Sequence, residues 1–338
     1  MASFAVHRLR SGDDRDQGDH PLDKLPYNLK KPHTLLYYYA ADWVSGAVLG
    51  ILTMIVGNTK LRARFYELTD PSFMYPYEED TVSVTMLIVI GVALPLVILA
   101  VVEALLKYRV KSWPVVLDVH HFFLGLMQSL ALGQLITVSL KVSVGRLRPS
   151  AFGRQTENIH GWNMSFPSGH TSMAFGSLTY LALFLAAKTG IFSKAGVWPS
   201  KDKIRSGDPF RGSFAIGIWV FIAPIALAIF VGATRLVDYA HDFSDVNAGA
   251  VIGIGCGWFA YQCNFPSVSD SLAALPRPLA HLHRSDPDWI RYYRNEKMGE
   301  GVEDDYGAMR TASRGRDPPR AEFASSFSPS ADIENGAR

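Results

Sequence analysis

The chain alternates long apolar runs with short polar segments. Each run lacks charged side chains and is close to the roughly 20 residues that a helix needs to cross a bilayer. The six runs span residues 43–59, 81–102, 122–140, 171–187, 212–234 and 246–269. This pattern predicts an all-α, polytopic membrane protein with a six-transmembrane-helix bundle.

Polar segments flank the apolar region at both ends. Residues 1–33 carry six Lys and Arg, and residues 266–338 are rich in Pro, Ser, Arg and acidic side chains, a composition typical of chain that forms no packed core. We therefore expect one membrane domain, residues 34–265, between an N-terminal polar tail and a disordered C-terminal tail. The net charge of +2 averages over these parts, and no motif indicates a nucleic-acid partner.

Small residues and prolines inside the runs predict how the helices pack. Glycines recur at every fourth position in two runs, which lets neighbouring helices approach closely. Two prolines lie inside other runs, where we expect kinks whose freed carbonyl groups are satisfied by a neighbouring helix. These positions are Gly46 and Gly50 in the first run, Gly249, Gly253 and Gly257 in the sixth, and Pro95 and Pro224 in the second and fifth.

The sequence does not indicate a metal centre. Cys256 and Cys263 lie two turns apart on one predicted helix, too far apart to form a disulfide, and no further Cys or His pair has ligand spacing. His120 and His121 are adjacent, so on a helix they point about 100° apart and cannot easily grip one ion. We expect these two histidines to have a structural role.

Three polar groups of residues lie where apolar runs meet short loops. Together they supply three fixed cations, two imidazoles and one carboxylate, the set that cleavage of a phosphate ester requires. If the runs cross the membrane, all three groups come to one face. They are Lys141-x6-Arg148-Pro149, Pro167-Ser168-Gly169-His170 and Arg235-x5-His241-x3-Asp245.

The middle group predicts an anion site at the start of a helix. Ser168 is a preferred N-cap, and the N–H groups of a first helical turn have no partners within the helix. Gly169 lets a ligand approach the backbone, and His170 can exchange a proton near neutral pH. His160 and Trp162 precede this turn and are candidates for contact with a substrate head group, and the acidic, Tyr-rich loop at about 58–80 could cover part of the site.

These three groups resemble the signature motifs of the type 2 phosphatidic acid phosphatase superfamily, in particular its six-span lipid phosphate phosphatase branch. Residue types, spacing and order all agree, over roughly residues 35–265. One departure is Thr234, where the family usually has serine before the arginine, and the hydroxyl group is retained. The resemblance implies a phosphatase of phosphatidate, diacylglycerol pyrophosphate or related lipid phosphates.

The resemblance also implies a role for each motif residue. His241 would attack phosphorus to form a phosphohistidine, with Asp245 orienting its imidazole, and His170 would protonate the leaving group and then activate water. The phosphate oxygens would be bound by Lys141, Arg148, Ser168, Gly169 and Arg235. Because three fixed cations make a divalent metal unnecessary, we expect no cofactor and metal-independent hydrolysis.

The substrate stays open at this point. The same site could serve a polyprenyl, sphingoid or sugar phosphate, or transfer a phosphoryl-bearing group to another lipid. A catalytically silent membrane relative is the alternative from another class, although such relatives usually lose the histidines or cations that this chain retains. The sequence does not indicate an oligomeric state.

The distribution of positive charge predicts the orientation in the membrane. Segments on the side of the tails carry fifteen Lys and Arg, against eight in the segments on the other side. Positive charge is enriched on the cytoplasmic side, so we expect cytosolic tails and a lumenal or extracellular active site. A glycosylation sequon begins at Asn163 on that same predicted face.

Overall fold

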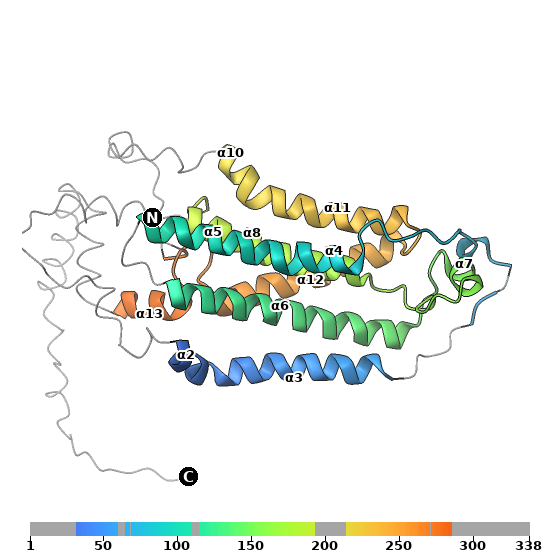
Figure 1. The fold of residues 1–338 in the computed structure, drawn as a ribbon, viewed down its shortest axis with the longest axis horizontal. Helices are drawn as coiled ribbons and strands as arrows, with labels where there is room; N and C mark the ends of the chain where they lie inside the picture. Colours follow the sequence, from blue (N-terminus) through green and yellow to red (C-terminus); the bar gives the residue numbers. More distant parts are fainter. Residues whose placement is uncertain are drawn as a thin grey trace, which may run out of the picture. The chain divides into compact units, whose positions relative to one another are not determined.

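A computed structural model describes residues 32–59, 65–67, 69–109, 115–192, 214–270 and 272–285. Most of both predicted tails, and most of the positively charged segments that gave the predicted orientation, lie outside these residues. The described parts of the chain are helical and contain no strand. The longer helices run side by side (Figure 1).

The helices correspond closely to the apolar runs. Five of them are long and apolar enough to cross a membrane: Ala40–Gly57, Val84–Tyr108, Val115–Val144, Gly169–Thr189 and Ala215–Val237. A further helix, α12, covers the sixth run but is not among these five. The elements are α2 Pro32–Tyr38, α3 Ala40–Gly57, η2 Pro71–Phe73, α4 Val84–Ile88, η3 Val89–Ala93, α5 Leu94–Arg109, α6 Val115–Val144, α7 Ala151–Thr156, α8 Gly169–Thr189, α10 Phe214–Gly217, η4 Ile218–Ile222, α11 Ala223–Val237, α12 Phe243–Asn264 and α13 Arg277–Ser285.

Helix α8 is the centre of the bundle. It packs against α6, α11 and α12, and most of its side chains are buried. Its N-terminus is capped by Ser168, as the sequence predicts, and its C-terminus ends at Gly190, whose positive φ of 67° suits a residue without a side chain. The beginning of α8 is therefore fixed within the bundle by the burial of the whole helix behind it.

The glycine stripe of α12 explains how closely this helix approaches α8. A Cβ atom on Gly253 would lie 2.6 Å from the Ser172 carbonyl oxygen and 2.7 Å from the Gly176 nitrogen, and Gly249 and Gly257 meet the α8 backbone similarly. The predicted packing role of these three glycines is confirmed. In α3 the prediction is confirmed for Gly46, which packs on the end of Met127, but Gly50 has no neighbour within 4 Å.

Both internal prolines are accommodated by a wider helical turn just before them. Pro95 follows η3 and Pro224 follows η4, and both are segments with i to i+5 hydrogen bonding. Pro95 cannot hydrogen-bond the Gly91 carbonyl four residues earlier, and the Ser177 hydroxyl of α8 donates to that carbonyl instead. The predicted rescue of a freed carbonyl by a neighbouring helix is confirmed at Pro95.

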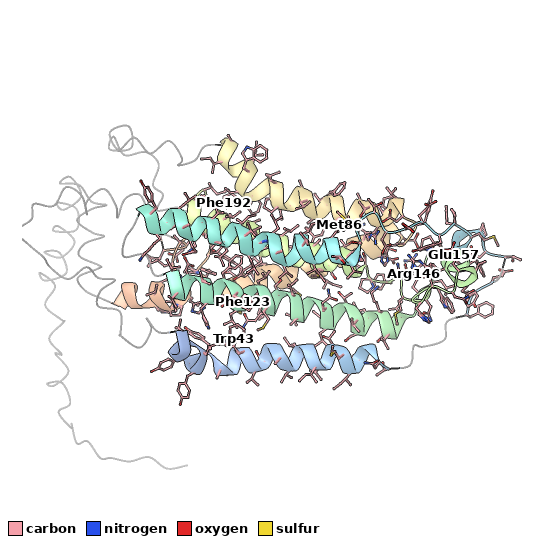
Figure 2. All side chains as sticks on the ribbon, in the orientation of Figure 1. Trp43, Met86, Phe123, Arg146, Glu157 and Phe192 are labelled. Carbon is pink, nitrogen blue, oxygen red and sulfur yellow. The ribbon has the colours of Figure 1, made fainter. Side chains whose placement is uncertain are left out.

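The predicted structural role of the adjacent histidines agrees with their contacts. His120 Nε2 accepts a hydrogen bond from Trp43 Nε1 at 3.1 Å, and the His121 ring pairs with Asn264 Oδ1 at 3.2 Å. Aromatic contacts join α3 to α6 beside them, where the rings of Trp43 and Phe123 stack (Figure 2). The two imidazoles thus join the helices to one another.

Candidate active site

The N-terminus of α8 lies directly against the first turn of α12. The Ser168 hydroxyl accepts hydrogen bonds from the Thr171 hydroxyl at 2.9 Å and from the Thr171 N–H at 3.4 Å. The Ser168 N–H donates to the Asp245 carbonyl oxygen at 2.9 Å. These bonds fix the turn while leaving the N–H groups at the start of α8 directed out of the helix, where they favour an anion.

Two of the predicted cations, Lys141 and Arg148, are held near this turn by backbone carbonyl groups. Lys141 lies in the last turn of α6, and its Cε lies 3.7 Å from the place where a Gly169 Cβ atom would be. Its ammonium group donates to the Met164 carbonyl at 2.7 Å. Arg148 donates from Nε to the Gly161 carbonyl at 2.9 Å and from Nη1 to the Ala240 carbonyl at 3.2 Å. Backbone carbonyls therefore orient both cations.

His241 and Asp245 lie together, although the helix begins after the histidine. Because α12 starts at Phe243, His241 belongs to the preceding loop, and its Nδ1 lies 3.7 Å from Asp245 Oδ2. The Ser165 hydroxyl donates to that carboxylate oxygen at 2.5 Å and lies 3.4 Å from His241 Nδ1. The pair therefore forms a group of three with Ser165, and the Nε2 atom of His241 is not engaged by it.

Arg146 holds the same carboxylate from its other side. Its Nη1 donates to Asp245 Oδ1 at 2.9 Å and to Ser244 Oγ at 2.5 Å, and its Nη2 donates to Asp242 Oδ2 at 2.5 Å. Asp245 is completely buried and also accepts the Asp242 N–H at 3.1 Å. A guanidinium group that bridges two carboxylates and a hydroxyl fixes the start of α12.

Arg235 projects from α11 between two carboxylates. Its Nη2 pairs with Asp238, and its Nη1 lies 3.1 Å from Asp80 Oδ1. Asp238 is in turn bound by the N–H and hydroxyl groups of Thr81, at 3.0 Å and 2.5 Å. The segment that precedes α4 therefore closes over the end of α11, which agrees with the predicted cover by the loop at 58–80.

His170 lies in the first turn of α8, close enough to Arg235, Arg148 and Asp80 for their charges to act on it. Its Nε2 atom is buried and has no hydrogen-bond partner among the described residues. An unpaired buried nitrogen is unfavourable unless a ligand supplies the partner. This nitrogen is therefore suited to exchange a proton with a bound group.

Burial and the cations together keep His241 neutral. Burial has the largest effect and lowers the pKa of His241 well below its ordinary value, the charges of Arg148 and Lys141 lower it further, and Asp245 opposes them. Burial and the neighbouring Arg154 likewise lower the pKa of Arg148, to about 10, so its guanidinium stays charged at neutral pH. A neutral imidazole beside fixed cations is the state that a nucleophile needs.

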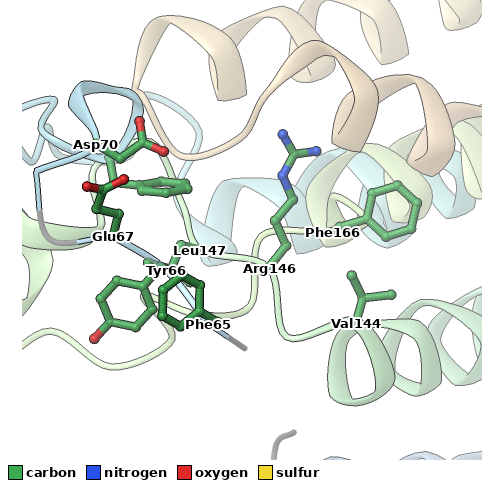
Figure 3. A pocket seen from close by; sticks show the side chains of 9 residues that line it. Phe65, Tyr66, Glu67, Asp70, Val144, Arg146, Leu147 and Phe166 are labelled. Carbon is green, nitrogen blue, oxygen red and sulfur yellow. The ribbon is translucent and has the colours of Figure 1, made fainter. Parts of the chain in front are cut away.

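A cavity of about 530 Å³ lies beside Arg146 (Figure 3). Aromatic rings from the segment before α4 and from the turn before α8 form much of its wall, and Glu67 and Asp70 add carboxylates. Its lining is Phe65, Tyr66, Glu67, Asp70, Phe73, Val144, Arg146, Leu147 and Phe166. The Arg146 side chain runs from this cavity to the Asp245 carboxylate, so the cavity adjoins the group formed by His241, Asp245 and Ser165.

The structure thus brings all eight motif residues to one end of the bundle. Of the two loop candidates, Trp162 supplies the carbonyl that accepts the Arg148 N–H at 2.8 Å, and His160 is exposed. The motif analysis missed several residues with direct contacts to the motif side chains, among them Asp80, Arg146, Ser165 and Asp238. Arg146 carried a signal, since it lies between Lys141 and Arg148, and Asp80 ends the acidic loop expected to cover part of the site. Within the described ranges, no group of three or more His, Cys, Asp or Glu side chains could hold a metal ion.

Fold and site together describe a bundle of apolar helices with a cluster of cations, imidazoles and carboxylates at one end. Residues 122–269 match the model of the PAP2 superfamily. The chain is 35% identical to a PA-phosphatase related-family protein of Dictyostelium discoideum over 213 residues, covering 62% of this chain and 70% of the relative. It is 31% identical to probable lipid phosphate phosphatase 4 of Arabidopsis thaliana, covering 77% and 81%.

A further relative is the probable diacylglycerol pyrophosphate phosphatase 1 of Schizosaccharomyces pombe, 32% identical over 103 residues, or 30% of each chain. No solved structure matches the chain. The chain belongs to the PAP2 superfamily, and the protein is a phosphatase of that family. The resemblance seen in the three motifs is therefore confirmed.

Proposed function

We propose that this phosphatase hydrolyses lipid phosphates through a phosphohistidine formed on His241. The observation that carries the proposal is the position of His241, whose Nδ1 faces Asp245 and Ser165 while the charges of Lys141 and Arg148 act on its ring. In this orientation Nε2 is the nitrogen available for attack. The carboxylate stabilises the positive charge that develops on the imidazole.

The first chemical step joins nitrogen to phosphorus and releases the lipid. As the His241 Nε2–P bond forms, the bond from phosphorus to the leaving oxygen breaks, and His170 supplies a proton to that oxygen. Lys141, Arg148 and Arg235 stabilise the charge on the remaining phosphate oxygens, together with Ser168 and the Gly169 N–H. We propose that this set of cations makes the reaction independent of a divalent metal.

The second step transfers the phosphoryl group to water. His170, now without its proton, takes a proton from a water molecule whose oxygen attacks phosphorus, and the N–P bond breaks to return neutral His241 and inorganic phosphate. Both steps use the same cations. The unpaired Nε2 of buried His170 supports its role as the group that exchanges the proton.

We propose that α12 is a sixth membrane-spanning helix, with the tails in the cytosol and the active site lumenal or extracellular. Its 22 residues are long enough to cross a bilayer, and apolar side chains on one face are exposed: Val251, Ile254, Trp258 and Phe259. The opposite glycine face packs on α8. Its polar first turn and its glycines lower its hydropathy, yet they are the residues that the site and the packing require.

A lipid substrate is supported by the bundle and by the named activities of the relatives. The probable lipid phosphate phosphatase matches 77% of this chain, and the probable diacylglycerol pyrophosphate phosphatase matches 30% of it. The exposed apolar faces of α3 and α5 suit contact with acyl chains. The aromatic cavity beside Arg146 offers room for part of a substrate next to its phosphate.

Phosphate release from the purified protein tests the proposal. Phosphatidate, diacylglycerol pyrophosphate, a sphingoid phosphate, a polyprenyl phosphate and glucose 6-phosphate should be compared, each with and without EDTA. We expect hydrolysis of the lipid phosphates in both conditions, and acid-labile phosphate on wild-type protein but not on His241→Ala. Preference for glucose 6-phosphate, or loss of activity in EDTA with recovery in magnesium, would contradict the proposal.

Sealed microsomes test the orientation. Protease added outside should remove tags from both tails, while a membrane-impermeant reagent should leave the site unmodified. Tags that are protected in intact microsomes and cleaved after detergent would overturn the proposed topology.

A further inference from the structure

The carboxylate of Asp80 lies among the cations of the active site. Its Oδ1 atom is 3.1 Å from Arg235 Nη1 and 3.8 Å from Arg154 Nη2. Its charge also acts on Arg148 and on His170. A negative charge therefore stands in the region where the phosphate of a substrate must be bound.

The contact between Asp80 and Arg235 is an ion pair of poor hydrogen-bond geometry. Asp80 Oδ1 is buried, yet it accepts no hydrogen bond from any described residue. The side chain as a whole keeps 32% of its surface exposed, in contrast to 1% for Arg235. The carboxylate can thus leave toward solvent without breaking a well-formed hydrogen bond.

The two carboxylates beside Arg235 differ in burial and in hydrogen bonding. Asp238 is 3% exposed, pairs with Arg235 Nη2 and is anchored by both polar groups of Thr81. On that side of the guanidinium Nη2 is engaged, whereas the buried Nε has no hydrogen-bond partner among the described residues. Nη1 faces Asp80, whose carboxylate holds the position that an oxyanion would take beside it.

The segment that carries Asp80 is anchored by other contacts. The Tyr75 N–H donates to the Pro149 carbonyl at 3.2 Å, and the Tyr75 ring stacks on Tyr239 at 4.8 Å between centroids. Arg154 lies over the Tyr77 ring at 4.8 Å. After Asp80, the N–H and hydroxyl groups of Thr81 bind Asp238. Removing the charge of Asp80 therefore leaves the segment supported on both sides of this residue.

We propose that Asp80 is a specificity-determining residue, whose carboxylate takes the place of a phosphate oxygen beside Arg235 in the free enzyme and gives way when a phosphate enters. This inference rests on the proposed function of the same site. Every phosphate must displace the carboxylate, so small free oxyanions bind weakly. A lipid phosphate offsets that cost through contacts of its apolar part, while the product phosphate has no such contacts and leaves readily.

Calorimetric titration of inorganic phosphate into the full-length protein in detergent tests the inference without requiring turnover. Asp80→Asn should bind phosphate about tenfold more tightly than wild type, because the competing charge has been removed. Asp80→Glu, which restores the charge, should stay close to wild type. Glu79→Gln removes a neighbouring exposed carboxylate and should leave the affinity unchanged.

Equal or weaker binding by Asp80→Asn would overturn the inference, because it would mean that Asp80 only positions Arg235. A measurement on wild type serves if the variant does not fold. Saturating phosphate should increase carbodiimide labelling of Asp80, mapped by mass spectrometry, relative to Glu78 and Glu79, and unchanged or decreased labelling would also overturn it. If the proposed function itself were wrong, no lipid phosphate would release inorganic phosphate. That outcome comes from the activity assay and is independent of the binding measurement.

Discussion

The two ends of the bundle each hold ion pairs among the described residues, but the pairs differ in how far their side chains are exposed. At the end formed by the last turn of α6 and the first turn of α8, Arg146 and Asp80 keep 31% and 32% of their side chains exposed. At the opposite end, Lys188 pairs with Asp118, and these side chains are 3% and 0% exposed. Both ends place ion pairs in an apolar bundle, so an ion pair alone does not mark a site.

The closed end satisfies its charges with the protein itself. The Lys188 ammonium also donates to the Ala274 carbonyl and lies over the rings of Phe184 and Phe265. The open end keeps the buried Nε2 of His170 unpaired within the described chain and holds Asp80 with poor hydrogen-bond geometry. At the closed end His121 Nε2 is likewise buried without a hydrogen-bond partner among the described residues, so an unpaired nitrogen alone does not mark a site. The accessible space beside the open end is what distinguishes it.

Replacing one histidine at each end is the strongest test of this contrast. His241→Ala should lower turnover of any substrate by about 10⁴-fold or more, because no phosphoenzyme can form. His121→Ala removes the contact with Asn264 at the other end and should lower the thermal midpoint while keeping the rate. Both variants are checked by measuring the rate per folded protein and the thermal midpoint in detergent. A loss of rate in His121→Ala comparable to that in His241→Ala would contradict the difference between the two ends.

The two histidines of the proposed active site should differ in how strongly the effect of their replacement depends on the leaving group of the substrate. His170→Ala should be impaired by about 10²- to 10⁴-fold with an alkyl phosphate, whose leaving oxygen needs a proton, and less so in forming phosphoenzyme from an activated aryl phosphate. Rapid-quench trapping of labelled protein provides the measurement. Label on His241→Ala combined with none on His170→Ala would reverse the two assignments.

Breaking the closed ion pair should affect stability rather than catalysis. Asp118→Ala takes from buried Lys188 its carboxylate partner and should cost about 3–5 kcal/mol of unfolding free energy. The double variant Asp118→Leu/Lys188→Met should recover much of that loss, because it leaves neither charge of this pair buried without its partner. Thermal or denaturant unfolding in detergent checks the order, with exposed Glu78→Gln as the control. A single variant as stable as wild type would show that the pair is dispensable.

The glycine stripe of α12 predicts a smaller loss of stability at the contact between α8 and α12, the two helices whose first turns carry motif residues. Gly253→Ala places a Cβ atom within 2.7 Å of the α8 backbone and should cost about 1–3 kcal/mol. Gly255→Ala, two residues along the same helix with no neighbour within 4 Å, should be neutral. Unfolding of the two variants under identical conditions gives the comparison, and equal stabilities would exclude tight packing of α8 on α12.

The helices and the motif residues could be predicted because both depend on local features of the sequence. Helix length follows from apolar runs, and Ser168, Gly169 and His170 form one capped turn. The contacts of Asp80 with Arg235, of Arg146 with Asp242, and of Ser165 with Asp245 join residues 80 to 155 positions apart. Such contacts depend on how the helices pack, which neither periodicity nor spacing specifies.

The boundary of α12 illustrates the same limit on a smaller scale. The four-residue spacing of His241 and Asp245 would place the two side chains one turn apart on a helix that began before His241. The helix begins at Phe243, and the two side chains meet because the loop before it turns back at Tyr239, whose φ of 48° is positive, and at Ala240. A spacing that matches a helical turn can therefore be realised by a loop.

The finest test of the open end is its pH dependence, since burial lowers the pKa of His241 well below its ordinary value of about 6.5. In the proposed mechanism the neutral imidazole is the nucleophile, so kcat/KM should keep its value as the pH falls through about 6.5 and decline only below it. Asp245 opposes the effect of burial, so in Asp245→Asn the acid limb should move to still lower pH, at a reduced rate. The same lowered pKa makes protonation of His241 unfavourable in the folded state, so the free energy of unfolding should fall as the pH drops below about 6.5.

The pH profile of kcat/KM must be measured with both an alkyl and an aryl phosphate, because the ionisation of the substrate also affects this profile. A limb that belongs to His241 keeps its position with both substrates, whereas a limb that follows the pKa of the substrate would refute the assignment.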